Sequence, residues 1–193
     1  MRRLPLILAA AVALATAAPA RAHALDIGPA PAAGELAGDG WQRAFDGRNA
    51  PYDGKCAPLA PGLYQPYSTT GEPIACDLPA GARLFIQFGA YCASWEGVRA
   101  PWEQRRCAVE SDAPIEGLRL SARGRSVEID RHRFEFVTRW RWVWVPEGEH
   151  HGLQTFTAHG HAAIIDGLRD GDVVTLDIGF PDGPFTFTVN VHR

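Results

Sequence analysis

The chain has 193 residues, 46% of them hydrophobic and 21% charged, which is enough apolar material for one ordinary domain with a core. Its formal net charge of -3 becomes -6 without the first 22 residues, because three arginines and no acidic residue are then lost. An acidic chain lacks the cations that neutralise phosphates, so we expect no general nucleic-acid binding.

Residues 1–22 have the pattern of a cleavable secretory signal peptide. Two arginines precede an uncharged, mostly apolar run from Leu4 to Ala20, and an Ala-Arg-Ala sequence ends at Ala22. Cleavage after Ala22 makes His23 the first mature residue, whereas the alternative cut after Ala24 removes it. The run is shorter than the ~20 residues of a spanning helix. We therefore expect export to the periplasm or the extracellular space, with no membrane span left after cleavage.

The segment from residue 23 to residue 61 is rich in Ala, Gly and Pro and poor in large apolar side chains. Such a composition can bury little surface, so we predict an irregular N-terminal arm. Residues 62–193 are predicted to form the folded domain.

From residue 62 onward, short runs of strand-forming residues alternate with turn residues. In chain order the runs are Arg83–Cys92, Leu118–Ala122, Ser126–Asp130, Phe134–Val145, Leu153–Ile165, Val173–Phe180 and Phe185–Val191. Asp182-Gly183 is a hairpin signal between the last two, in which apolar and polar side chains alternate. Pro101 could open one helical turn. The pattern predicts an all-β domain, mostly antiparallel, with at most one short helix. A β-sandwich of the immunoglobulin-like or jelly-roll-like kind is our first expectation, and a barrel is the alternative.

The four cysteines of the chain are Cys56, Cys76, Cys92 and Cys107. An even number in an exported chain predicts two disulfides. Three pairings are open, and the sequential one, Cys56–Cys76 with Cys92–Cys107, closes the shortest loops and is our choice. No CxxC pair is present, which argues against a cysteine-based zinc site.

The segment Phe134–Val145 combines aromatic residues with arginines. Five aromatic side chains share one parity and therefore one predicted strand face: Phe134, Phe136, Trp140, Trp142 and Trp144. Arg139 and Arg141 occupy the opposite face. Our first interpretation is that the aromatic face is core, since each ring can bury about 150–250 Å². The alternative is that the tryptophans lie open as a flat platform for sugars or a peptide, with the two arginines as further binding residues.

Four of the seven histidines lie close together in the sequence: His150, His151, His159 and His161. His159 and His161 are two residues apart, so a strand places both on one, more polar, face. With His150 or His151 as a third ligand they could bind zinc or copper, because neutral imidazole suits both metals. The alternative is that all four are exposed polar residues.

His23 offers a separate metal prediction. A free terminal amine and its own imidazole can chelate copper. In this one residue the chain resembles exported copper carriers and copper-dependent polysaccharide oxygenases.

No GxSxG, phosphate-binding glycine loop or HExxH motif is present. The leading prediction is an exported, non-catalytic β-sandwich that binds an unidentified partner or ligand, a protein or an envelope glycan. Two alternatives stay open. One is a copper- or zinc-binding periplasmic protein that uses the histidine cluster, and the other is a small exported hydrolase or copper oxygenase.

Overall fold

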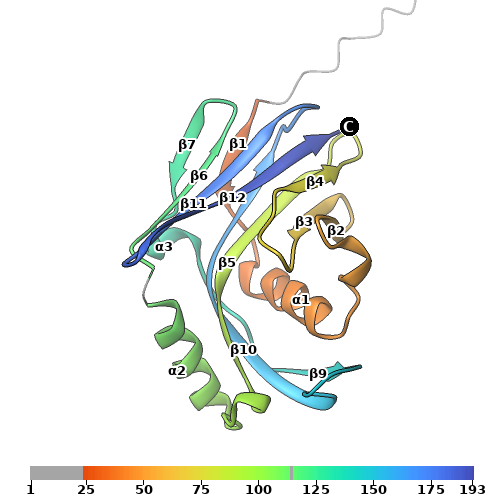
Figure 1. Ribbon diagram of the computed structural model, residues 1–193. Helices are drawn as coiled ribbons and strands as arrows, with labels where there is room; N and C mark the ends of the chain where they lie inside the picture. The colour runs from red at the N-terminus through yellow and green to blue at the C-terminus, as the bar shows by residue number, and fades with distance from the viewer. Residues whose placement is uncertain (1–23, 114) are drawn as a thin grey trace, which may run out of the picture.

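The computed structural model describes residues 24–113 and 115–193, so the predicted signal peptide and His23 lie outside the described residues. The described chain is mostly β, and its 12 strands form one sheet that curls nearly into a closed barrel (Figure 1). The strands are β1 (Asp26–Pro29), β2 (Lys55–Ala60), β3 (Leu63–Tyr67), β4 (Ile74–Asp77), β5 (Arg83–Ala93), β6 (Gly117–Ala122), β7 (Arg125–Glu128), β8 (Glu135–Val137), β9 (Arg141–Val145), β10 (Gly152–Asp166), β11 (Val173–Phe180) and β12 (Gly183–His192). The helices are α1 (Ala33–Phe45), α2 (Pro101–Asp112) and α3 (Arg131–Phe134), with 3-10 turns η1 (Ala50–Tyr52) and η2 (Ser94–Glu96).

The sheet runs in the order β1-β10-β5-β3-β2-β4-β12-β11-β6-β7, and β8 and β9 also pair with β10. The long strands β5 and β10 pair antiparallel over ten residue pairs and curve across the whole molecule. The two ends of the sheet meet where the Arg125 guanidinium donates to the carbonyl of Leu25. The mostly β class is therefore confirmed, but the strands form one rolled sheet rather than the two facing sheets of a sandwich.

Alternating side chains of β5, β6, β10, β11 and β12 fill the interior of the roll. Leu84, Leu120, Ile165, Ile178 and Val189 are all 4% exposed or less. On β11 and β12 every buried position lies on the face that the alternating sequence predicts, although Phe185 on that face is 44% exposed, and the two strands form the expected hairpin. Two smaller clusters lie under α1, on the opposite face of β5 and β10.

The prediction that residues 23–61 form an irregular N-terminal arm is wrong, because this segment contains β1, α1, η1 and β2. Two glycines of this segment lie where α1 contacts other parts of the chain closely. A Cβ on Gly34 would lie 2.5 Å from the backbone oxygen of Val137, and one on Gly38 would lie 2.3 Å from Nε of Arg141. Glycine occupies these two positions because α1 approaches the sheet closely there.

The expectation of at most one short helix is also wrong, since the described chain has three. The proline at Pro101 does open a helix, but α2 continues for 12 residues. Among the described residues, no helix is long and apolar enough to span a bilayer.

Both disulfides are present and have the predicted sequential pairing. Cys56–Cys76 joins β2 to β4, two strands that share a single ladder pair, Lys55 with Ala75. Cys92–Cys107 ties α2 to β5. Loops of this length contribute roughly 3 kcal/mol each in the chain-entropy treatment. The two bonds therefore reinforce the places where hydrogen-bonded pairing is thinnest or absent.

The single strand predicted for Phe134–Val145 is broken into β8 and β9. Val137 pairs with His159 and Arg141 pairs with Phe156, so four steps along one strand oppose three along the other. The extra residue forms a β-bulge. Every side chain after it therefore points to the opposite face of the sheet from the one that uninterrupted alternation predicts. Thr138 fills the bulge, donating its N–H to the carbonyl of Ala158 and accepting from the Ala158 N–H through Oγ1.

Candidate functional site

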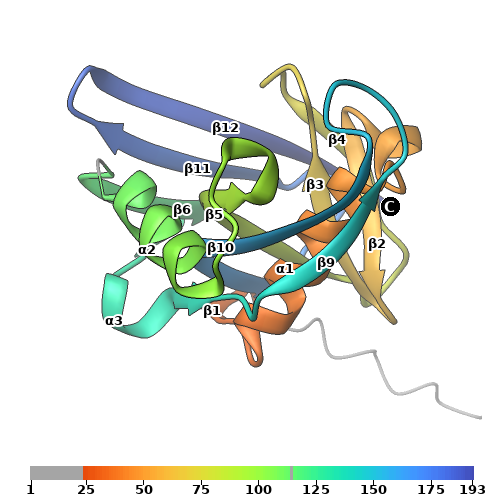
Figure 2. The ribbon, with the colours of Figure 1, turned by 90° about the horizontal axis from the view of Figure 1, so that it is seen from below.

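The bulge separates the five aromatic residues of the predicted ladder. Phe134 and Phe136 are 1% and 4% exposed, whereas Trp142 and Trp144 are 54% and 55% exposed. The buried position of β9 is Val143 instead. The core interpretation therefore holds for the two phenylalanines and fails for the tryptophans. Figure 2 shows β9, which carries them, running side by side with β10.

The exposed tryptophans form a ridge, which we define as Trp140, Trp142 and Trp144. The rings of Trp140 and Trp142 meet edge to face with centroids 4.9 Å apart. The ring of Trp144 meets that of His151 in the same way at 5.3 Å. Leu153, 60% exposed, lies opposite Trp144 on β10 and extends the apolar surface. Exposed large apolar side chains that gather in this way are candidates for contact with a partner or ligand.

A groove of about 370 Å³ lies beside Trp140 and Trp142 of this ridge, and Trp144 is outside its lining. Trp140 and Trp142 form one part of its lining, and the rest comes from Ser94, Arg99, Leu153, Gln154 and Thr155. The groove therefore lies between β9, the first residues of β10 and the segment that leads into α2.

Hydrogen bonds hold the polar floor of the groove in place. Ser94 Oγ donates to Oε1 of Gln154 at 2.7 Å and accepts the backbone N–H of Thr155 at 2.9 Å. Gln154 Nε2 donates in turn to the carbonyl of His150 at 3.1 Å. Arg99 is exposed at the edge of the groove and forms no ion pair with any described residue. The floor is preorganised, and one cation beside it is available to a ligand.

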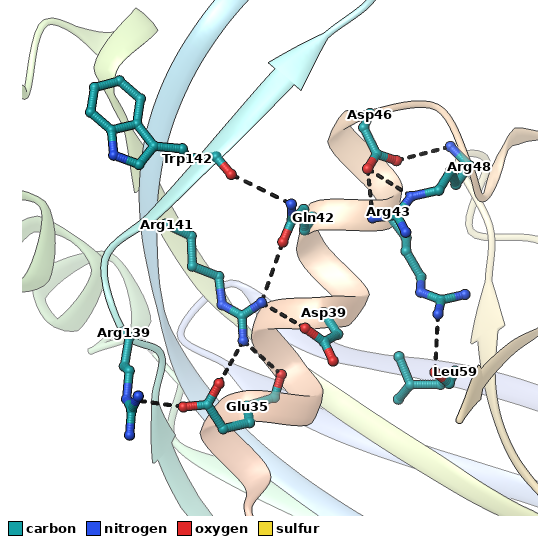
Figure 3. Close-up of polar contacts among 10 residues, drawn as sticks. All are labelled: Glu35, Asp39, Gln42, Arg43, Asp46, Arg48, Leu59, Arg139, Arg141 and Trp142. Carbon is teal, nitrogen blue, oxygen red and sulfur yellow. Dashed lines mark hydrogen bonds and ion pairs between the residues drawn. The ribbon is translucent and has the colours of Figure 1, made fainter. Parts of the chain in front are cut away.

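Arg141 fixes the direction in which the tryptophans point. It lies on the face of β9 opposite Trp142, and its guanidinium forms ion pairs with Glu35 at 2.8 Å and Asp39 at 2.6 Å on α1 (Figure 3). Gln42 of the same helix reaches the carbonyl of Trp142 at 3.5 Å. These contacts hold β9 against α1 and leave the other face of β9, with its indole rings, to solvent.

Arg139 is the other arginine singled out from the sequence. Its side chain is 86% exposed and pairs with Glu35 at 3.0 Å. It contacts α1 rather than the groove, and neither Arg139 nor Arg141 lines the groove. Their assignment as ligand-binding residues stays a prediction, and the contacts favour a role in positioning β9.

The predicted histidine pair lies in a second polar cluster. His159 and His161 share one face of β10, as expected, but α2 covers that face and they are 7% and 3% exposed. Nδ1 of His159 lies 2.9 Å from Asp112 of α2, and Nε2 lies 2.8 Å from Glu135 of β8. No described residue bonds either ring nitrogen of His161. The face is polar without being exposed, because Gln104, Ala108 and Asp112 form the stripe of α2 that packs on it.

The two imidazoles differ in proton affinity. The Asp112 carboxylate, together with Glu135, raises the pKa of His159 above its ordinary value against the opposing effect of burial. Burial lowers the pKa of His161 against the opposing charge of Asp112, and the charges of His159 and Arg131 add to the lowering. The cluster therefore favours one charged and one neutral imidazole in adjacent positions.

The structure does not bring the other predicted metal ligands to this pair. His150 stacks on Trp95 at 5.5 Å and His151 packs against Trp144, both at the opposite end of β10 from His161. No set of three or more His, Cys, Asp or Glu side chains suited to a metal occurs among residues 24–113 and 115–193. Zinc or copper binding, with or without His23, stays a prediction.

Sequence reasoning did not find Ser94, Arg99 and Gln154 in the groove or Asp112 and Glu135 in the histidine cluster. These residues come from different elements, and no spacing in the sequence connects them. The tryptophans carried a signal through their unusual density, and His159 and His161 through their spacing of two residues.

No family model, curated protein or solved structure matches this chain. A function has to be argued from the geometry alone.

Proposed function

We propose that this chain is an exported, non-catalytic glycan-binding protein whose site is the groove beside the ridge of Trp140, Trp142 and Trp144. The observation that carries the proposal is the exposure of three indole rings on one ridge beside a groove with a preorganised polar floor. The two disulfides support an oxidising compartment such as the cell envelope or the exterior.

The composition of the groove matches the two kinds of surface that a sugar presents. A pyranose ring has a flat C–H face that packs on an indole, and a rim of hydroxyl groups that need hydrogen-bonding partners. Trp142 and Trp140 supply flat apolar surface, and Arg99, Ser94 and Gln154 supply polar groups at its edge. A purely apolar partner would cover the exposed Arg99 without offering it a hydrogen-bond acceptor, which disfavours an apolar peptide or an acyl chain.

The lining argues for binding rather than cleavage. Glycoside hydrolysis generally uses two carboxyl groups that flank the bond to be broken. The described residues that line the groove include no Asp or Glu. Asp112, which is buried, and Glu135, whose side chain is 48% exposed, contact His159 instead.

Binding should be tested with Trp142→Ala against insoluble peptidoglycan, a neutral glucan and an acidic polyuronate. We expect the wild type to bind at least one of them, and the variant to bind it about tenfold more weakly. Stacking of a flat ligand on an aromatic ring contributes about 1–3 kcal/mol, and 1.4 kcal/mol corresponds to tenfold. Co-sedimentation for the solid and isothermal titration for soluble chains give the affinities.

Trp102→Ala is the matched control, since Trp102 is 72% exposed on α2 and does not line the groove. Its affinity should equal that of the wild type. Equal losses in both variants would mean that glycans adhere to tryptophans nonspecifically, and would refute the groove. Failure of the wild type to bind any of the three glycans, with binding of an extended peptide in their place, would assign the ridge to protein recognition.

A further inference from the structure

A second cavity lies away from the tryptophan ridge, where two neighbouring strands of the sheet separate. β3 and β5 pair in parallel at only two positions, Leu63 with Arg83 and Tyr64 with Leu84. Beyond them no ladder joins the two strands. The gap between the following residues holds a cavity of about 330 Å³, which lies at the lower end of the range for small-molecule sites.

The cavity has an apolar body. Phe88 of β5, Ile178 of β11 and Phe187 of β12 line its inner part, which adjoins the main core. Ala44 and Trp41 of α1 close it from the other face of the sheet. No described lining residue is charged. The lining therefore excludes anions and cations as favoured occupants and selects a neutral, mostly apolar molecule.

One end of the cavity is polar, and three of its polar atoms have no hydrogen-bond partner among the described residues. Nε1 of Trp41 and the Oε1 atoms of Gln65 and Gln87 are buried without a hydrogen bond, and Gln65 as a whole is 3% exposed. A buried polar atom without a partner costs about 1–3 kcal/mol. Three such atoms at one cavity are therefore a costly arrangement for the chain by itself.

Gly40 of α1 makes this arrangement sterically feasible. A Cβ at Gly40 would lie 2.4 Å from Oε1 of Gln65 and 2.8 Å from Nε2 of Gln87. The two amides thus converge on Gly40, a helical position without a side chain. They lie close together but do not bond each other.

We propose that this cavity is a binding site for a neutral, mostly apolar small molecule with a hydroxyl or carboxamide head group. The head bonds Gln65, Gln87 and Trp41, which together offer acceptors and a donor, and the apolar part lies against Phe88, Ile178 and Phe187. A volume of about 330 Å³ suits on the order of ten non-hydrogen atoms, since a water molecule occupies about 30 Å³ in the liquid. The site is independent of the proposed glycan groove, because the two share no lining residue.

The proposal can be tested with three probes of one shape: 2-naphthol, naphthalene and naphthalene-2-sulfonate. Equilibrium dialysis at pH 7 against the full mature chain gives the three affinities. We expect 2-naphthol to bind about tenfold more tightly than naphthalene, because only the hydroxyl satisfies the buried polar atoms. The sulfonate should not bind measurably.

Two variants locate the binding. Ala44→Phe should fill the cavity and abolish binding of 2-naphthol and naphthalene, whereas Ala50→Phe, at an exposed position outside the cavity, should leave both unchanged. Gln65→Leu should remove the preference for 2-naphthol over naphthalene. It should also keep or raise the melting temperature, because it deletes a buried unpaired group. Gln104→Leu is its control and should lower the melting temperature, since Nε2 of Gln104 donates to Val98 and Thr155.

Equal affinity for 2-naphthol and naphthalene would overturn the role of the polar end. Absence of binding by both, or binding that survives Ala44→Phe in a folded variant, would overturn the site and leave the cavity as one that water fills.

Discussion

His159 and His161 lie two residues apart on β10, and their pKa values are shifted in opposite directions. His159 lies between two carboxylates, Asp112 from α2 and Glu135 from β8. His161 is buried without a hydrogen bond to either ring nitrogen, with Asp112 3.8 Å from its Nδ1 and Arg131 of α3 nearby. Protonation of the first strengthens the packing of α2 on β10, and protonation of the second opposes it.

This difference predicts two opposite pH dependences of stability. The pKa of His159 is raised on folding, so its contribution is full below the unfolded pKa near 6.5 and is lost as pH rises through the folded value. The pKa of His161 is lowered, so its contribution is full above about 6.5 and is lost as pH falls towards the folded value.

Urea denaturation from pH 5 to pH 9 should separate the two effects. Relative to the wild type, His159→Gln should be most destabilised on the acid side and less so as pH rises. His161→Gln should gain relative to the wild type as pH falls below about 6.5. If the two variants shift the free energy of unfolding with the same sign of slope, the assignment of the two pKa directions is wrong.

The exposure of Trp142 makes a prediction about stability that is separate from binding. Trp142→Ala should change the free energy of unfolding by less than about 1 kcal/mol, as expected for an exposed position. Phe136→Ala, at a position 4% exposed, should cost about 3–5 kcal/mol. Urea midpoints with unchanged m-values measure both. A loss for Trp142→Ala as large as that for Phe136→Ala would mean that the ridge is covered in solution.

At the scale of elements, the curvature of β5 and β10 depends on two facing glycines. Gly89 and Gly160 are paired across the two strands. A Cβ on Gly160 would lie 2.2 Å from the carbonyl oxygen of Phe88, and one on Gly89 would lie 2.2 Å from that of His159. Both contacts are with backbone, which cannot rotate away. The two long strands can therefore approach each other here only without side chains.

Gly160→Ala should accordingly destabilise the protein by about 3 kcal/mol, the upper part of the range for overpacking. Gly117→Ala on β6 is the control, because a Cβ there meets nothing within 4 Å. Its melting temperature should stay the same or rise, since alanine restricts the unfolded chain. Equal melting temperatures for the two variants would contradict the close approach of β5 and β10.

The sequence predicts strands well where apolar and polar residues alternate without interruption. The strands β5, β6, β10, β11 and β12 lie where alternating or β-branched runs were found. The same counting fails after Thr138, because a bulge leaves no mark in the alternation of apolar residues. Helix α1 was missed for a related reason: its glycines are tolerated only because Val137 and Arg141 pack against them. Pairs such as Asp112 with His159 depend on a helix and a strand that are far apart in sequence.

At the scale of the whole molecule, the mostly β class and both disulfides were predictable, but the barrel-like closure was not. Sandwiches and barrels share strands with one apolar face, and they differ in which strands pair. Here the deciding pairs are β12 with β4 and β1 with β10, each between distant parts of the chain. The local sequence of each strand does not indicate these pairings.

The placement of β10 late in the chain also governs when the molecule can fold. Synthesis runs from the N-terminus, and β1, β8 and β9 have their pairing partner only once Gly152–Asp166 has been made. Until then β5 lacks its longest ladder as well. Folding dominated by pairings between distant segments is slow, and strand edges that have not yet paired are prone to aggregation. We expect a chain that emerges extended, assembles late, and depends on its surroundings to keep it from self-association until β10 and then β11 and β12, the partners of β6 and β4, have been made.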